Sequence, residues 1–288
     1  MNEKQFIAAL RAIAGTSDAR DLQDDAAVLD IGGETLILTH DTVVQGVHVR
    51  DDEDPADIAW KLVAVNLSDL AAKGAAPIGV LIGHMLGEGD DRFVDGLREV
   101  LQTYDVPLLG GDTVSGPAIR SWGCTAVGRA THVPVPDRRG ARSGDKIFVT
   151  GTLGLAMQGL KDRRSGSTSD LAYRRPEPLL AEGQALAPLV TAMMDVSDGL
   201  LLDATRMATA SNATFVLDSA AAPVADEARR SECLRWGDDY QLLFTAAPNT
   251  VLPVSAACIG TVAQDRGTAL VVDGQALGED QSLGYSHG

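Results

Sequence analysis

Aspartate residues mark the ends and turns of several apolar segments in this 288-residue chain. They stand beside stretches that read as strands at 24–25, 41, 112, 195, 198 and 238–239, and Asp69 lies within a long apolar helical segment. An ionised carboxylate is costly to bury unless it is paired or binds a metal. One such residue alone is equally well a cap or a turn residue, as we expect for Asp54 and Asp90. Six or more at strand ends indicate a shared site.

Oxygen ligands of this kind suit Mg²⁺, Mn²⁺ or Ca²⁺ rather than zinc. Few lysines lie near these aspartates in the sequence, so neutralisation by salt bridges is not evident. The chain carries a net charge of −16 and would repel nucleotide phosphates without intervening cations. Bound Mg²⁺ ions would bridge carboxylates and phosphates, so the chemistry expected is Mg²⁺-dependent phosphoryl transfer from ATP.

Other catalytic signatures are missing from the sequence or weak. It contains no GxxxxGK[ST] loop, no GxGxxG opening a helix, no HExxH and no GxSxG. The segment 151–154 could present backbone amides to a phosphate, and an ordinary tight turn explains it equally well. His48 follows Asp41 by seven residues in a glycine-containing turn, which makes it the strongest functional candidate among the five histidines.

Composition excludes several classes of partner. The acidic charge disfavours nucleic acid and anionic lipid. No run of about 18 apolar residues exists to cross a membrane, and the N-terminus lacks the apolar region of a signal peptide. The cysteines Cys124, Cys233 and Cys258 show no paired spacing, so we expect them to be buried structural residues of a cytoplasmic protein.

The helices and strands that must position the aspartates are predicted from hydrophobic periodicity and from the residues that begin and end such elements. Helical patterns cover 3–14, 55–73, 90–104, 179–190 and 199–211. Strand patterns cover 26–29, 35–39, 78–86, 106–109, 119–130, 146–150, 192–194, 214–217, 240–245, 257–262 and 269–272. The glycines at 110–111 read as a turn after a short strand, and residues 162–178 read as a surface loop.

Residues 131–145 form the best candidate for a domain boundary, because prolines, glycines and basic residues gather there. We therefore expect an N-terminal domain over 1–133 and a C-terminal domain over 134–288. A short echo links the two halves: residues 66–70 resemble residues 195–199 in their order of Asn or Asp, Ser and Asp.

Several segments match one known family in content and in order. They are Asp24–Val28, Thr39–Asp41, Gly46–His48, Ala64–Ala72, Gly110–Thr113, Val149–Gly154, Asp195–Leu200 and Asp239–Phe244. From about residue 3 to the C-terminus the chain resembles the thiamine-monophosphate kinase family of the aminoimidazole-ribotide-synthetase-like superfamily. The resemblance implies a two-domain α/β (α+β) fold, with an N-terminal half-barrel that forms a homodimer and a C-terminal α/β domain that closes over nucleotide and substrate.

The same resemblance implies a reaction and a set of roles. ATP would phosphorylate thiamine monophosphate to thiamine diphosphate, with several Mg²⁺ ions bound. The implied Mg²⁺ ligands are Asp25, Thr39, Asp41, Asp69, Asp112, Asp195 and Asp198. Among them Asp69, Asp112 and Asp198 would be catalytic. The implied ATP contacts are Gly111, Asp112, Arg138 and Ser197, and the implied substrate contacts are His48, Asp238 and Tyr285.

The chain departs from the family pattern mainly on the acceptor side. Asp238 stands where the family usually has glutamate, His40 where it has threonine or serine, and Leu155 where it has aspartate. Two alternatives therefore remain open. The chain could act on another small acceptor, although it lacks the N-terminal cysteine of selenophosphate synthetases and the C-terminal cysteine tail of the hydrogenase-maturation enzymes. It could also be a nucleotide or metal sensor without turnover.

Overall fold

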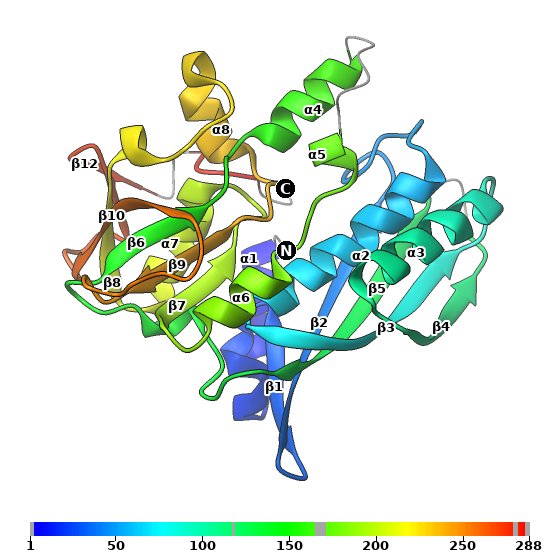
Figure 1. Ribbon diagram of the computed structural model, residues 1–288, viewed down its shortest axis with the longest axis horizontal. Helices are drawn as coiled ribbons and strands as arrows, with labels where there is room; N and C mark the ends of the chain where they lie inside the picture. Colours follow the sequence, from blue (N-terminus) through cyan, green and yellow to red (C-terminus); the bar gives the residue numbers. More distant parts are fainter. Residues whose placement is uncertain (1–2, 117–118, 165–170, 279–281, 286–288) are drawn as a thin grey trace.

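The computed structural model describes residues 3–116, 119–164, 171–278 and 282–285. Two β-sheets form its framework, one from each half of the chain, and the long helix α2 (Pro55–Ala72) lies between them (Figure 1). No helix in these described ranges is both long and apolar enough to span a bilayer.

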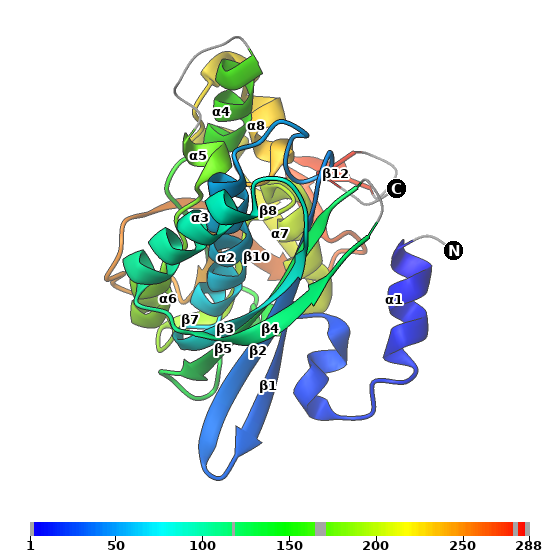
Figure 2. The same cartoon turned by 90° about the vertical axis from the view of Figure 1, so that its right-hand side faces the viewer.

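The first sheet has five strands in the order β1-β2-β5-β3-β4, and only β3 and β4 run parallel. Buried and partly exposed residues alternate along β5, so one face of the sheet is packed and the other is open. Helices α2 and α3 (Asp90–Tyr104) cover the packed face (Figure 2). The strands are β1 (Ala26–Ile31), β2 (Glu34–Val44), β3 (Ala75–Met85), β4 (Leu108–Val114) and β5 (Ser121–Ala130).

The second sheet has seven strands in the order β12-β11-β8-β10-β6-β9-β7. Helix α7 (Leu200–Ala210) packs on one face, and α6 (Leu180–Leu186) lies with the end of α2 on the other. The strands are β6 (Lys146–Thr150), β7 (Val190–Asp195), β8 (Ala213–Leu217), β9 (Leu242–Ala246), β10 (Ala256–Gln264), β11 (Leu270–Val272) and β12 (Gln275–Leu277).

Helix α2 has no exposed face because it packs against both sheets. Every residue from Ala56 to Ala72 is buried, as expected for a helix that is apolar all round. The helix begins where Asp54 accepts a hydrogen bond from the Ala56 amide at 3.0 Å, with Pro55 in the first turn. It stops before Gly74, whose φ of +59° and close approach to Ala187 exclude a side chain.

The remaining helical segments are short or lie at the periphery. They are α1 (Glu3–Arg11), η1 (Ser17–Leu22), η2 (Arg138–Gly140), α4 (Leu155–Arg164), α5 (Leu171–Arg174), η3 (Ser219–Ala221), η4 (Glu227–Arg229) and α8 (Arg230–Trp236). The boundary expected between residues 133 and 134 falls in the stretch that joins the two sheets, and its position stays a prediction.

The prediction for residues 106–113 was wrong in one respect. Gly110 and Gly111 do not form a turn but continue β4, which runs on to Val114. Glycine is depleted in strands, and for this reason the pattern predicted a turn. Here β3 lies so close that a Cβ on Gly111 would be 1.9 Å from the Ile82 carbonyl oxygen. Close backbone approach, rather than a turn, is therefore the reason for this glycine.

Other boundaries also need correction. Strand β2 extends past Asp41 to Val44, so Asp41 lies within the strand rather than after it. Part of the loop predicted at 162–178 is the helix α5, and residues 165–170 lie outside the described ranges. Helix α8 and strand β12 were not predicted, because both are short and carry a weak pattern. Cys124 and Cys233 are buried as expected, but Cys258 is exposed.

Candidate active site

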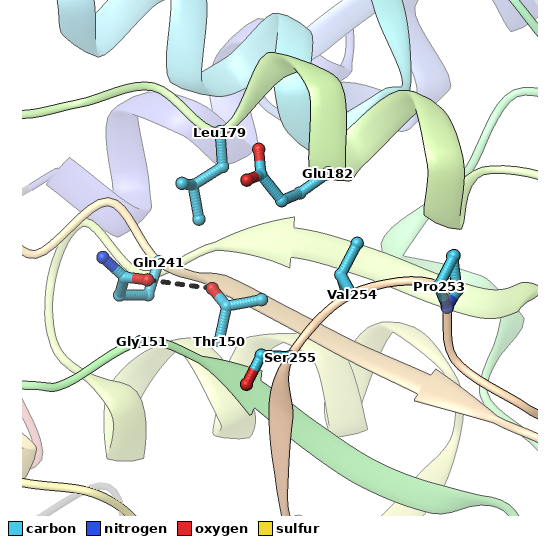
Figure 3. A pocket seen from close by; sticks show the side chains of 8 residues that line it. All are labelled: Thr150, Gly151, Leu179, Glu182, Gln241, Pro253, Val254 and Ser255. Atoms are coloured by element: carbon cyan, nitrogen blue, oxygen red, sulfur yellow. Dashed lines mark hydrogen bonds between the residues drawn. The ribbon is translucent and has the colours of Figure 1, made fainter.

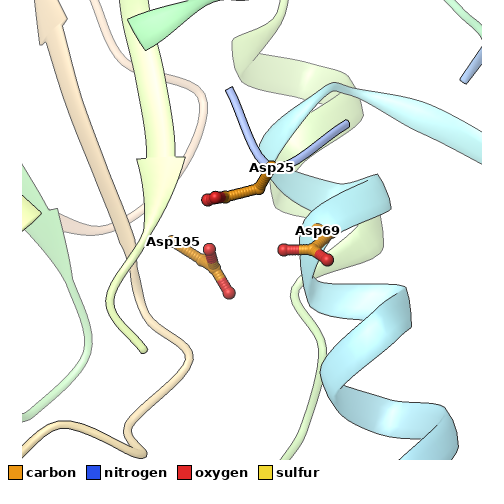
Figure 4. Close-up of side chains that lie close together, drawn as sticks. All are labelled: Asp25, Asp69 and Asp195. Atoms are coloured by element: carbon orange, nitrogen blue, oxygen red, sulfur yellow. The ribbon is translucent and has the colours of Figure 1, made fainter. Parts of the chain in front are cut away.

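Three carboxylates from distant parts of the chain point toward one another between the two sheets (Figure 4). Asp25 stands just before β1, Asp69 lies on α2 and Asp195 ends β7. One oxygen atom from each lies within 4.8 Å of the others. Asp69 and Asp195 are buried, and Asp25 is partly open to solvent. The convergence predicted for these three residues is therefore present in the fold.

Strand β2 lines the same space with Thr39 and Asp41. The Thr39 hydroxyl lies 2.5 Å from Asp69 Oδ2 and 3.1 Å from the Asp25 carbonyl oxygen. The backbone amide of Asp41 donates to Asn66 Oδ1 at 3.0 Å. Asn66 and Asp69 are three residues apart on α2, so one face of that helix holds the strand in place.

The electrostatics of the cluster disfavour its ionised form. Burial, followed by the charges of Asp195 and Asp198, raises the pKa of Asp41 to about 6. Burial is also the largest cause of the raised pKa of Asp195, and for Asp69 it combines with the charges of Asp41 and Asp195 to raise the pKa well above 3.8. Crowded carboxylates with oxygen-only donors fit a divalent cation such as Mg²⁺, which would offset this repulsion.

Basic residues do reach the aspartates, contrary to the expectation from sequence proximity. Arg138 forms an ion pair with Asp25, and Arg206 contacts Asp198 at 2.5 Å. Lys73 lies 2.5 Å from Asp24, which also pairs with Arg20. Arg138 and Lys73 come from far along the chain and Arg206 from α7, so spacing alone did not reveal them, whereas Arg20 lies only four residues before Asp24. Asp24 is thereby occupied in structural ion pairs.

The loop that follows Asp195 is tied to the segments that carry the predicted substrate contacts. The Asp238 amide donates to the Ser197 carbonyl oxygen at 2.7 Å, and the Tyr285 amide donates to the Asp198 carbonyl oxygen at 2.9 Å. Gly237 allows this approach, since a Cβ there would lie 2.4 Å from the Ser197 oxygen. Asp238 itself has a φ of +63°, a strained conformation that recurs at functional sites.

The predicted substrate contacts thus lie at one end of the aspartate cluster. His48 follows β2, and its Nδ1 accepts a hydrogen bond from the Val44 amide at 3.0 Å. Asp238 accepts hydrogen bonds from the Tyr240 hydroxyl at 3.0 Å and from Lys61 at 2.5 Å. Tyr285 is 40% exposed, so its ring remains accessible to a ligand.

Gly111 and Asp112 lie elsewhere in the same chain. Gly111 pairs with Ile82, Ile82 with Cys124, and Cys124 with Asp41, so three strand spacings separate β4 from β2. That is roughly 14 Å, too far for Asp41 and Asp112 of one chain to bind the same ion. Gly111 and Asp112 instead border a hollow of about 360 Å³ between β4 and α3, whose apolar wall includes Phe93.

Two backbone amides of the turn at 151–154 already have partners within the chain, and the first is that of Leu153, which donates to the Pro223 carbonyl oxygen at 3.0 Å. The Gly154 amide donates to both oxygens of Asp239, at 2.8 and 2.9 Å. Burial raises the pKa of Asp239 to about 7. A second hollow of about 290 Å³ opens beside this turn, where Thr150 donates to Gln241 at 2.9 Å (Figure 3). Strand β9 separates this hollow from β7, which carries Asp195.

Two further polar residues of the site were not predicted. The Ser68 hydroxyl donates to Asp195 Oδ2 at 2.6 Å, and Lys61 contacts Asp238. The short echo between residues 66–70 and 195–199 was a signal for Ser68, because these two segments touch in the fold. Nothing in the spacing of the sequence pointed to Lys61.

The fold and site define the chain as a member of the AIR synthase related proteins. Residues 23–130 match the N-terminal domain of that family, and residues 142–273 match its C-terminal domain. The thiamine-monophosphate kinase of Escherichia coli K12 is 36% identical, over 92% of this chain and 90% of that protein. The enzyme of the same name from Caulobacter vibrioides is 35% identical, over 95% and 87%.

Comparison with solved structures points to the same family. The structure described as AaThiL complexed with AMPPCP and TMP superposes with a TM-score of 0.88 at 28% identity, covering 99% of this chain and 97% of that one. The thiamine-monophosphate kinase of Stenotrophomonas maltophilia K279a gives 0.76 at 32% identity, covering 95% and 96%. The chain belongs to the thiamine-monophosphate kinase family, and the two-domain fold expected from the sequence is confirmed.

Proposed function

We propose that the protein transfers the γ-phosphoryl group of ATP to thiamine monophosphate, giving thiamine diphosphate and ADP. The observation that carries the proposal is the meeting of Asp25, Asp69 and Asp195 between the sheets, next to the loops that bear His48 and Asp238. Relatives at 36% identity carry the name of this activity. A related structure is described with an ATP analogue and TMP bound.

Several Mg²⁺ ions would be held by the aspartate cluster. Asp25, Asp69 and Asp195 supply the central oxygens, with Thr39, Asp41 and Asp198 at its edge. Mg²⁺ bound there would neutralise phosphate charge and orient the phosphates. The acceptor atom is a phosphate oxygen and needs no strong base, so the protein's own contribution is to position and desolvate the reactants.

The nucleotide would be held by residues of both halves. Arg138 carries a guanidinium that suits phosphate oxygens, and Ser197 lies in the loop after β7. The hollow between β4 and α3 has the size and apolar wall that suit a purine base, with the Gly111 backbone at its border.

We further infer that two copies of the chain share each site. Strand β1 pairs with β2 only as far as Thr39, so residues 40–44 of β2 have no strand beside them on the side away from β5 within the described residues. Strand β4 likewise pairs with β3 alone in the described part of the chain. Open strand edges beside an open sheet face favour pairing with another chain. Pairing of β4 with β2 of a second copy would close a barrel and place Asp112 of one copy beside Asp41 of the other.

The decisive test is steady-state turnover of the purified protein with ATP, Mg²⁺ and thiamine monophosphate. We expect ADP and thiamine diphosphate to appear together and only when all three are present. Parallel reactions with other small acceptors separate this proposal from a related activity. ATP binding without thiamine diphosphate formation would contradict it.

A further inference from the structure

Lys61 is a buried cation at the acceptor end of the site. It lies on α2 and is only 2% exposed, which is costly for an ammonium group unless it is well paired. Its Nζ lies 2.5 Å from Asp238 Oδ2 and 3.3 Å from the His48 carbonyl oxygen. It also lies 4.1 Å from the centre of the Tyr173 ring. Three segments far apart in the sequence therefore meet at one ammonium group.

Two of these partners are the residues expected to contact the acceptor. Asp238 is held from both sides, because Tyr240 donates to its other oxygen at 3.0 Å. Each carboxylate oxygen has two lone pairs, so Asp238 retains capacity for a donor on a ligand. Tyr173 reinforces the arrangement, since its hydroxyl donates to the same His48 carbonyl oxygen at 3.3 Å.

We propose that Lys61 is a positioning residue for thiamine monophosphate, an inference that rests on the proposed function. Its ammonium group holds the Asp238 carboxylate at a fixed distance from the loop that carries His48. In that position Asp238 would accept a hydrogen bond from the amino group on the pyrimidine ring of thiamine monophosphate. Aspartate is one methylene shorter than the glutamate usual in the family, so its reach depends on this orientation. In this proposal Lys61 acts through its contact with Asp238 and not by binding a phosphate group itself.

The test compares Lys61→Met with Arg175→Met by steady-state kinetics. Arg175 contacts Asp57 on α2 at 2.5 Å, one helical turn before Lys61. It therefore links the segment that carries Tyr173 to the same helix, but at a distance from Asp238. We expect Lys61→Met to raise KM for thiamine monophosphate about tenfold or more, with KM for ATP within about twofold. Arg175→Met should leave both KM values within about twofold.

A double variant tests whether Lys61 works through Asp238. Adding Asp238→Asn to Lys61→Met should raise KM for thiamine monophosphate by less than Asp238→Asn does alone, because coupled residues are not additive. Lys61→Arg keeps the charge and should recover part of the loss. It also serves as the folded variant, checked by circular dichroism, if Lys61→Met does not fold.

Failure of this inference can be separated from failure of the proposed function. An unaltered protein that never forms thiamine diphosphate overturns both. An active unaltered protein whose Lys61 variants keep a normal KM for thiamine monophosphate overturns only the role of Lys61. An equal rise in KM in Arg175→Met also overturns it, because loosening of the whole segment would then explain the effect.

Discussion

Asp69 and Asp195 are carboxylates that the fold makes costly to ionise. Both are buried, and burial is the larger cause of the raised pKa in each case. Such a pair destabilises the folded chain unless a cation or a proton neutralises it. We therefore expect these carboxylates to lower the free energy of unfolding of the metal-free protein, and bound Mg²⁺ to raise it again.

Asp69→Asn should abolish turnover while preserving the fold. The amide removes one of the crowded charges, so the metal-free variant should be as stable as the unaltered protein or more stable. We expect kcat to fall by about a hundredfold or more, because the Mg²⁺ ions that neutralise the transferred phosphoryl group lose one of their ligands. Activity assays and thermal melts in EDTA check both parts. Near-normal turnover would remove Asp69 from the proposed ligands.

The metal-free protein should lose stability as the pH rises past the pKa of Asp41. That pKa is raised to about 6, so folded Asp41 holds its proton more tightly than the unfolded chain does. Its contribution is complete below about pH 4 and is lost as the pH rises through about 6. Asp41→Asn should therefore gain about 3 kcal/mol relative to the unaltered protein as the pH rises from about 4 to above 6.

Chemical denaturation in EDTA across that pH range measures the difference. Saturating Mg²⁺ should reverse the order, because the ions stabilise only the chain that still has the carboxylate. If the stability difference between the two proteins does not change with pH, the pKa of Asp41 is not raised in the folded state.

Among the elements, α2 is the one that organises the site. It contributes Asp69, Ser68 and Lys61, which face the first sheet, the second sheet and the acceptor loops in turn. A helix buried on all sides can hold groups toward several segments at once. It must then satisfy every polar side chain that it buries.

Asn66→Ala should loosen β2 against this helix. Asn66 is fully buried, donates to the Leu62 carbonyl oxygen at 2.8 Å and accepts from the Asp41 amide. Its loss leaves the partly buried Asp41 amide without this partner, at a cost of about 1–3 kcal/mol. We expect a lower melting temperature and a higher Mg²⁺ requirement.

Thr103→Ala is the matched control, because it removes an exposed side-chain hydrogen bond on α3. That change should cost less than about 0.5 kcal/mol. If both variants melt together and need the same Mg²⁺ concentration, Asn66 does not support the position of Asp41.

At the scale of the whole molecule, the open sheet separates Asp112 from the other aspartates. The register places β4 three strands from β2 on the same sheet. The site of one chain is therefore incomplete if Asp112 is a Mg²⁺ ligand. A second copy, joined through the free strand edges, supplies it in the assembly that we propose.

Complementation between inactive variants tests this assembly. A mixture of Asp112→Asn and Asp195→Asn chains, allowed to exchange subunits, should recover about a quarter of the unaltered activity, since half of the dimers are mixed and one site in each is intact. Turnover of the exchanged mixture, compared with the unaltered protein at the same total concentration, measures it.

A mixture of Asp69→Asn and Asp195→Asn is the control. Both residues belong to one chain's cluster, so every site keeps a defect and no activity should return. No recovery in the first mixture would mean that Asp112 serves its own chain or serves no site.

The sequence supported much of the fold and part of the site. Helix α2 was predictable within one residue at its end because its cap, proline and closing glycine are local signals. The strand β4 was cut short, because glycine reads as a turn until the closeness of β3 is known. Asp25, Asp69 and Asp195 were identifiable, since carboxylates in apolar segments violate local preference.

By itself, the sequence determined which residue types are available for Mg²⁺ and nucleotide chemistry, and which family the chain resembles. The tertiary structure alone decided which of them meet. Lys61 reaches Asp238 across 177 residues, and Ser68 reaches Asp195 across 127. Asp112 stays apart from the cluster of its own chain. Burial and pairing depend on contacts between segments remote in sequence, and local patterns carry no record of those contacts.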